Sequence, residues 1–91
     1  MQEIMIEETK YILLENHNEG FNIDMLLEKY TDYFVPFDYI VGDWAYGKLR
    51  LKGFYKKENK NCTSINDYNN VNDYIKNNCA FECSYFILEK K

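Results

Sequence analysis

The sequence holds few of the residues on which catalytic and metal sites depend, with one histidine and three cysteines among 91 residues. His17 lies in a polar stretch without a neighbouring nucleophile motif, so we interpret it as a turn residue or a residue exposed to solvent. The chain also lacks a glycine-rich phosphate-binding loop, a nucleophile elbow and a pair of carboxylates at a defined spacing. These absences predict a protein that is not an enzyme and that uses no cofactor or metal.

The three cysteines are an odd number, which does not suit the disulfide framework of a small secreted domain. Cys79 and Cys83 are four residues apart, but structural zinc needs four ligands, and only Cys62 and His17 remain to complete them. Free cysteine is among the most buried residue types, so we expect thiols that pack in the core. A redox-active or metal-linked pair is the alternative for Cys79 and Cys83.

Long apolar runs are also missing, since none approaches the roughly 18–20 residues that span a bilayer. The first eight residues are acidic, unlike a secretory signal, so we expect a cytoplasmic protein without a membrane partner. Basic residues number 11 against 15 acidic ones, and a formal net charge of −4 argues against DNA as a partner. The charge is uneven, however: residues 48–60 carry six cations and one acid, whereas residues 1–43 carry two cations and ten acids. This asymmetry predicts one electropositive surface on an acidic body.

The plentiful residues predict a single α+β domain over residues 1–91. Hydrophobic residues make up 46% and aromatic residues 18% of the chain, which is enough for one modest core. Asn22 is expected to cap the first helix, and Pro36 to end it before residue 35. The expected elements are strands at about 10–15, 38–43, 48–55 and 83–88, a possible short strand at 4–6, and helices at about 23–34 and from about 65 or 71 onward. This β-α-β-β-α-β order is typical of ferredoxin-like sandwiches, with an antiparallel sheet and two helices packed on one face.

Residues 39–55 hold the single tryptophan and three of the four glycines. The turn is expected at residues 44–47, with Gly47 in a left-handed conformation and Asp43 accepting backbone N–H bonds from the turn. Strand alternation places Leu49 and Leu51 toward the core and the basic residues on the other face. The resulting candidate contact surface comprises Trp44, Tyr46, Lys48, Arg50, Lys52 and Phe54.

Two functions use such a surface, and a purely structural interpretation stands beside them. Exposed aromatics at a hairpin tip usually contact proteins, so the leading hypothesis is a protein-interaction or regulatory module with an unknown protein partner. Cations beside aromatics also suit phosphates and stacked bases, which makes an RNA-binding module the alternative. The structural interpretation is a solvated edge strand whose lysines discourage aggregation, with Trp44 folded back onto the sheet.

Two stretches of the chain resemble a known family. They are DYIVGDWAYGKLRLKGFY at residues 38–55 and, within residues 73–88, an Asp-Tyr segment followed by Cys-x-x-x-Cys-x-Tyr-Phe. Together they are similar to the signature of the YutD-like family, small proteins of Bacillus-type bacteria, and the resemblance covers nearly the whole chain. It implies a cytosolic α+β protein of the Firmicutes and their wall-less relatives, and it brings no activity with it. Cys62 has no counterpart in the family pattern, which argues against a three-cysteine site.

Overall fold

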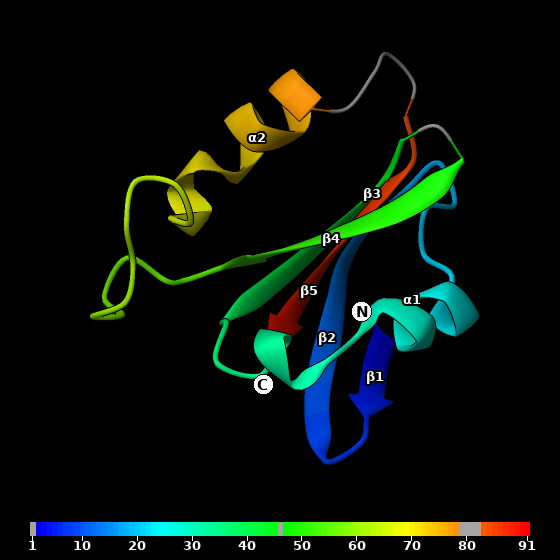
Figure 1. The fold of residues 1–91 in the computed structure, drawn as a ribbon, viewed down its shortest axis with the longest axis horizontal. Helices are drawn as coiled ribbons and strands as arrows, with labels where there is room; N and C mark the ends of the chain where they lie inside the picture. The colour runs from blue at the N-terminus through cyan, green and yellow to red at the C-terminus, as the bar shows by residue number, and fades with distance from the viewer. Residues whose placement is uncertain (1, 46, 79–82) are drawn as a thin grey trace.

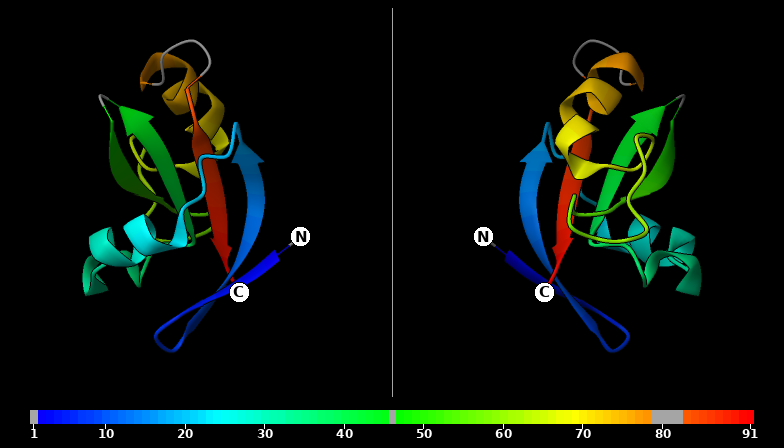
Figure 2. Two further views of the ribbon diagram at one scale, coloured as in Figure 1. Left: turned by 90° about the vertical axis from the view of Figure 1, so that its right-hand side faces the viewer. Right: turned by 90° about the vertical axis from the view of Figure 1, so that its left-hand side faces the viewer.

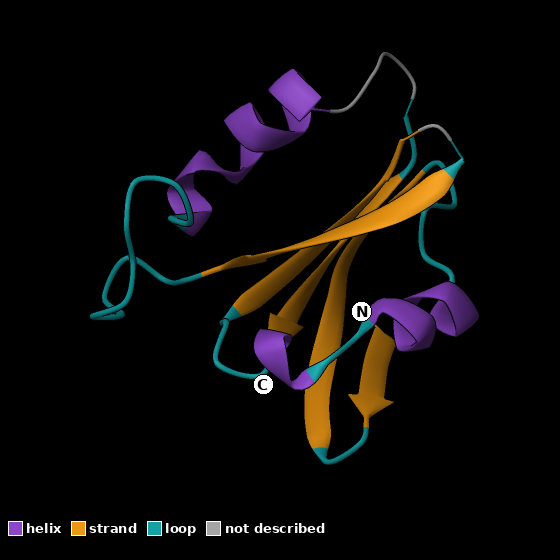
Figure 3. Ribbon diagram, in the orientation of Figure 1, coloured by secondary structure: helices purple, strands orange, loops and turns teal. Residues whose placement is uncertain are grey.

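The computed structural model describes residues 2–45, 47–78 and 83–91, which form a five-stranded antiparallel sheet with helices on both sides (Figures 1 and 3). The predicted α+β class is therefore confirmed. The elements are β1 (Gln2–Ile6), β2 (Thr9–His17), α1 (Ile23–Lys29), the 3-10 helix η1 (Asp32–Phe34), β3 (Tyr39–Ala45), β4 (Lys48–Phe54), the 3-10 helix η2 (Tyr68–Asn70), α2 (Val71–Asn78) and β5 (Tyr85–Lys90). No helix among these residues is long and apolar enough to cross a membrane.

The strand order across the sheet is β1-β2-β5-β3-β4, and each neighbouring pair is antiparallel. This does not confirm the ferredoxin-like order. The short strand suggested near residues 4–6 is real and forms an N-terminal hairpin with β2. β5 lies between β2 and β3, which Figure 2 shows as the red strand between the blue and green ones, and β1 and β4 are the two edges of the sheet.

The prediction that both helices cover one face of the sheet is wrong. Leu26 of α1 packs in a core cluster with Ile40 of β3, whereas Val71 of α2 packs in a second cluster with the next residue of that strand, Val41. Side chains of consecutive strand residues point to opposite faces, so α1 and α2 lie on opposite sides, as Figure 1 shows on either side of β4. We call these the α1 face and the α2 face. The physical reason is that residues 39–41 are all buried, and a strand that is apolar on both faces needs a cover on each.

Local signals set the helix starts more closely than the helix ends. Asn22 caps α1 as predicted, because its Oδ1 accepts a hydrogen bond of 3.1 Å from the N–H of Met25. The helix ends at Lys29 rather than near residue 34, since Tyr30 turns to an extended conformation and its hydroxyl lies 2.9 Å from that of Tyr11 in β2. Of the two starts considered for the second helix, the structure shows the later one, Val71.

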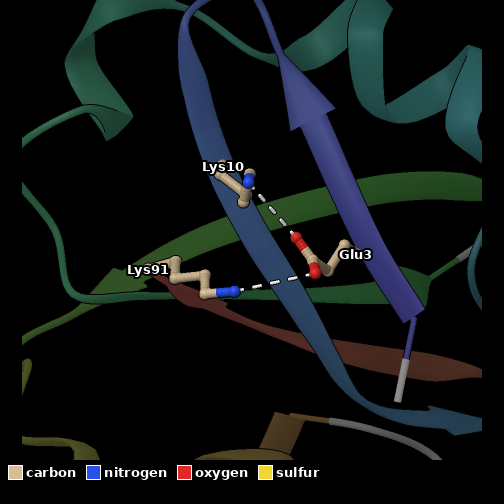
Figure 4. Close-up of polar contacts among 3 residues, drawn as sticks. All are labelled: Glu3, Lys10 and Lys91. Atoms are coloured by element: carbon tan, nitrogen blue, oxygen red, sulfur yellow. Dashed lines mark ion pairs between the residues drawn. The ribbon is translucent and has the colours of Figure 1, made fainter.

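Glu3 of β1 lies between the side chains of Lys10 and Lys91 (Figure 4). Glu3 lies 3.5 Å from Lys10 Nζ and 3.6 Å from Lys91 Nζ, and the N–H of Lys91 donates to the carbonyl of Lys10. The positive charges of Lys91 and Lys10 hold the pKa of Glu3 below its usual value. Because all three side chains are about half exposed, these ion pairs fix geometry more than they add stability.

Candidate functional site: the β3–β4 hairpin

The hairpin of β3 and β4 carries most of the predicted contact surface. Its strands pair in register from Tyr39 opposite Phe54 to Ala45 opposite Lys48. Gly47 has φ +76°, which confirms the predicted left-handed conformation at the turn. Tyr46 lies outside the described residues, so its predicted place in the contact surface stays a prediction.

The basic residues of β4 do share one face, as strand alternation predicts. Lys48, Arg50 and Lys52 lie opposite Ala45, Asp43 and Val41, on the α2 face. Lys48 is exposed, the Arg50 side chain is 46% exposed and Lys52 is half-buried. We call these three residues the basic strip. Their exposure decreases from the turn toward the part of the face that α2 covers.

Phe54 is not a contact residue, contrary to the prediction. It is only 1% exposed and belongs to the core cluster of Val41 and Val71, with the Tyr74 ring 5.5 Å away. Strand alternation correctly places Phe54 on the α2 face, but α2 covers this end of that face and buries the ring. Lys52 Nζ lies 5.3 Å from the Phe54 ring centre and 5.7 Å from that of Tyr74, so its charge lies over one buried and one partly buried aromatic ring.

Trp44 lies on the other side of the sheet from the basic strip. It pairs with Leu49 and packs against the core cluster on the α1 face. Its Nε1 donates a hydrogen bond of 2.7 Å to the carbonyl of Gly20. Of the two interpretations of Trp44, the structure therefore supports the one in which it folds back onto the sheet.

The prediction that Asp43 accepts backbone hydrogen bonds from the turn is wrong. Asp43 is 1% exposed, and its Oδ2 accepts a 2.5 Å hydrogen bond from Nη2 of Arg50 directly across the hairpin. Its Oδ1 has no hydrogen-bond partner in the described structure. Burial, followed by the negative charge of Asp43, raises the pKa of the neighbouring Tyr74. A buried carboxylate balanced by one half-exposed guanidinium is a costly arrangement that depends on Arg50.

The cysteines and the histidine lie apart from this hairpin. Cys83 is disulfide-bonded, which contradicts the expected free thiols, whereas Cys79 lies outside the described residues, so its predicted role stays a prediction. Cys62 is a free thiol packed against the core, and burial raises its pKa, with the charge of Asp67 adding to the effect. His17 is exposed, as expected, and stacks on Tyr85 with 4.9 Å between ring centres. No cluster of three metal-ligating side chains occurs in the described parts of the chain.

Comparison with known proteins bears out the resemblance seen in the hairpin sequence. A family described as "Putative antitoxin YutD-like" matches residues 5–89. The chain belongs to the YutD-like family. It is 39% identical over 87 residues to "Putative antitoxin YutD" of Bacillus subtilis (strain 168), with 96% of each chain covered. It is also similar to a solution NMR structure of protein yutD from B. subtilis, with TM-score 0.83, 37% identity, and 100% of this chain and 83% of that chain covered.

Sequence reasoning on this YutD-like chain missed two features of the hairpin region. The first is the Asp43–Arg50 pair. The predicted four-residue turn at 44–47 did not bring these two residues together, whereas the observed pairing of Ala45 with Lys48 places Asp43 opposite Arg50. The second is a groove beside β4 lined by Tyr33 and Ile65, which come from segments on either side of the hairpin in the sequence. No local pattern brings those two side chains together, so no sequence signal could have found the groove.

Proposed function

We propose that this protein is a non-catalytic protein-binding module of the cytoplasm, acting as an antitoxin that binds and restrains a protein toxin. The family and its B. subtilis relative are described as putative antitoxins, which supports a protein partner. The contact surface would be the basic outer strand of the hairpin, β4, together with the basic segment that follows it. The partner would present acidic groups to that strand.

One observation carries the proposal: the cations of an acidic chain are concentrated on an exposed edge strand. β4 is the last strand of the sheet, and Lys48 near its start is exposed with no ion pair to another described residue. The exposed side chains of Lys56, Lys57 and Lys60 continue the positive charge beyond the strand. Complementary charge of this kind speeds encounter and selects among partners.

The same geometry favours a protein partner over RNA. Recognition of single-stranded RNA combines phosphate contacts with aromatic rings on which bases stack. Phe54 is buried and Trp44 faces the other side of the sheet, so neither ring offers a stacking surface beside the lysines. RNA binding is therefore the alternative outcome of the test.

The structure also decides which variants test the proposal. A glutamate at Arg50 would place a second carboxylate against buried Asp43, and an alanine at Trp44 would remove core packing, so both changes threaten the fold. Lys48→Glu changes an exposed side chain of the strip without such a partner. Lys29→Glu is the matched control, because Lys29 is an exposed lysine at the end of α1, on the other side of the sheet.

The experiment is affinity capture of the tagged protein from lysate of the cell that makes it, with and without nuclease, beside both variants. We expect one protein to be enriched despite nuclease, to be depleted by Lys48→Glu and to be retained by Lys29→Glu. Expressed alone, that protein should arrest growth of a host, and co-expression of this chain should restore growth. Enrichment that collapses with nuclease would replace the proposal with RNA binding, and a captured protein without toxicity would remove the antitoxin role.

A further inference from the structure

The outer edge of β4 carries backbone groups that the sheet leaves open. The carbonyl of Asp38 and the N–H of Trp44 both bond toward β5, so the odd-numbered residues of β3 bond to the even-numbered residues of β4. The odd-numbered residues of β4 then direct their N–H and C=O groups outward. Tyr55, just beyond the strand, confirms this direction, since its N–H and C=O bond to the segment 66–68 on the outer side.

That segment covers only the end of the edge. Among the described residues, no hydrogen bond reaches the outward groups of Leu49, Leu51 or Gly53. An open edge of this kind is a template on which another strand can pair. Its length, residues 49–53, suits a short extended segment.

A groove that combines apolar and polar lining residues lies beside this edge on the α1 face. It has a volume of about 230 Å³ and is lined by Tyr33, Phe37, Leu51, Lys52, Gly53, Ile65 and Asn66. Tyr33 is 67% exposed and Ile65 is 75% exposed, although both are large apolar side chains. Gly53 lets the ring of Phe37 pack directly against the backbone of β4, because that ring lies where a Cβ would be. The groove can receive apolar side chains of a strand paired with β4.

The two faces of the edge therefore favour different side chains on a strand that pairs with β4. On the α1 face, the groove offers the exposed apolar side chains of Tyr33 and Ile65. On the α2 face, the side chains of Lys48 and Arg50 are cationic. Side chains of an added strand alternate between these faces. Resting on the proposed function, we infer that the partner docks by adding to the open edge of β4 an extended segment in which acidic and apolar side chains alternate.

The charge pattern also excludes a second copy of this chain as the favoured occupant. Two β4 strands paired antiparallel about Arg50 would place Lys48 opposite Lys52 twice, and like charges directly opposite each other destabilise a strand pair. The same lysines attract glutamate or aspartate on an incoming strand. The edge is thus protected against self-association and selective for an acidic strand.

A synthetic peptide tests this without knowledge of the partner. The probe is a short capped peptide alternating glutamate and valine, added at about 1 mM to isotope-labelled protein and followed by NMR, a concentration that detects weak strand addition. We expect shifts at the amides of Leu49, Leu51 and Gly53 and at the side chains of Tyr33 and Ile65. The peptide methylated on its backbone nitrogens, and a lysine–valine peptide, should produce none.

Two variants sharpen the test. Ile65→Glu alters the groove at its most exposed apolar side chain, and Lys48→Glu alters the basic face; each should weaken peptide binding about tenfold. Lys29→Glu should leave it unchanged. No shifts along the edge, or equal shifts with the methylated peptide, would overturn the inference. Stronger shifts of the same amides with a single-stranded RNA oligonucleotide would overturn it in favour of nucleic acid.

The failure of this inference can be told apart from failure of the proposed function. If a toxin is captured and neutralised but hydrogen exchange at Leu49, Leu51 and Gly53 is not slowed in the complex, the inference fails and the proposed function stands. If the glutamate–valine peptide binds the edge but no toxin is captured, the docking mode stands and the antitoxin role fails.

Discussion

Replacing Arg50 with alanine should be the most damaging change at the surface of this protein. It leaves Asp43, which is 1% exposed, with neither carboxylate oxygen hydrogen-bonded by a described residue. Removing one partner of a fully buried ion pair costs about 3–5 kcal/mol. The Arg50 side chain is 46% exposed, so water can reach the site, and we reduce the expected loss to about 2 kcal/mol.

Urea denaturation measures this loss. A domain of this size has a free energy of unfolding of about 5–14 kcal/mol, so a loss of about 2 kcal/mol is a large fraction of it. With a typical urea dependence, the unfolding midpoint should fall by about 1 M. Lys48→Ala, at an exposed lysine of the same face, should change the free energy by no more than about 0.5 kcal/mol.

A second variant isolates the charge. Asp43→Asn keeps the shape of the side chain but removes the buried negative charge, so adding it to Arg50→Ala should recover part of the lost stability. If Arg50→Ala proves as mild as Lys48→Ala, the ion pair is unimportant and the reasoning is refuted. In that case Arg50→Glu would no longer threaten the fold and could be used to test binding.

Three further changes have expected outcomes. Gly42→Ala should cost about 1–3 kcal/mol in a thermal melt, because the new Cβ would lie 2.2 Å from the buried ring of Phe86. Trp44→Phe should cost about 1 kcal/mol in urea, since it loses the indole hydrogen bond but keeps an aromatic ring. Burial and a hydrogen bond to a carboxylate raise the pKa of Tyr39 to about 12 from 10.0. The stability from this group is complete below about pH 10 and is lost as pH rises toward about 12, and Tyr39→Phe should remove that part of the alkaline decline in urea titrations.

Each of these has a result that contradicts it. An unchanged melting temperature for Gly42→Ala would mean that the ring of Phe86 can move away from the new Cβ without loss of stability. Equal stability of Trp44→Phe and the parent protein would show that water replaces the indole hydrogen bond. For Tyr39→Phe, an alkaline decline identical to that of the parent would assign the pH dependence to other tyrosines.

Local patterns were sufficient for the strands and for the basic strip. Alternation of charged and apolar residues along β4 places Lys48, Arg50 and Lys52 on one face wherever the strand lies in the sheet. The cap at Asn22 and the left-handed Gly47 likewise depend only on neighbouring residues. Such features survive into the tertiary structure because no distant contact is needed to create them.

The parts of the site that sequence reasoning got wrong depend on segments far away in the chain. Phe54 is buried because α2 folds over it, and Trp44 turns inward because the carbonyl of Gly20 accepts its hydrogen bond. The groove exists only because Tyr33 and Ile65 reach the same edge. Alternation tells which side chains share a face, but not whether another element covers that face.

The amino-acid sequence by itself determined the α+β class, the strand positions, the family and the concentration of positive charge after residue 47. Only the tertiary structure decided that the helices lie on opposite faces, that Asp43 is buried against Arg50, and that β4 is an open edge. The reason is that periodicity and capping act over a few residues, whereas strand order and burial arise from contacts between distant segments. The surface proposed to bind a partner belongs to that second kind of information.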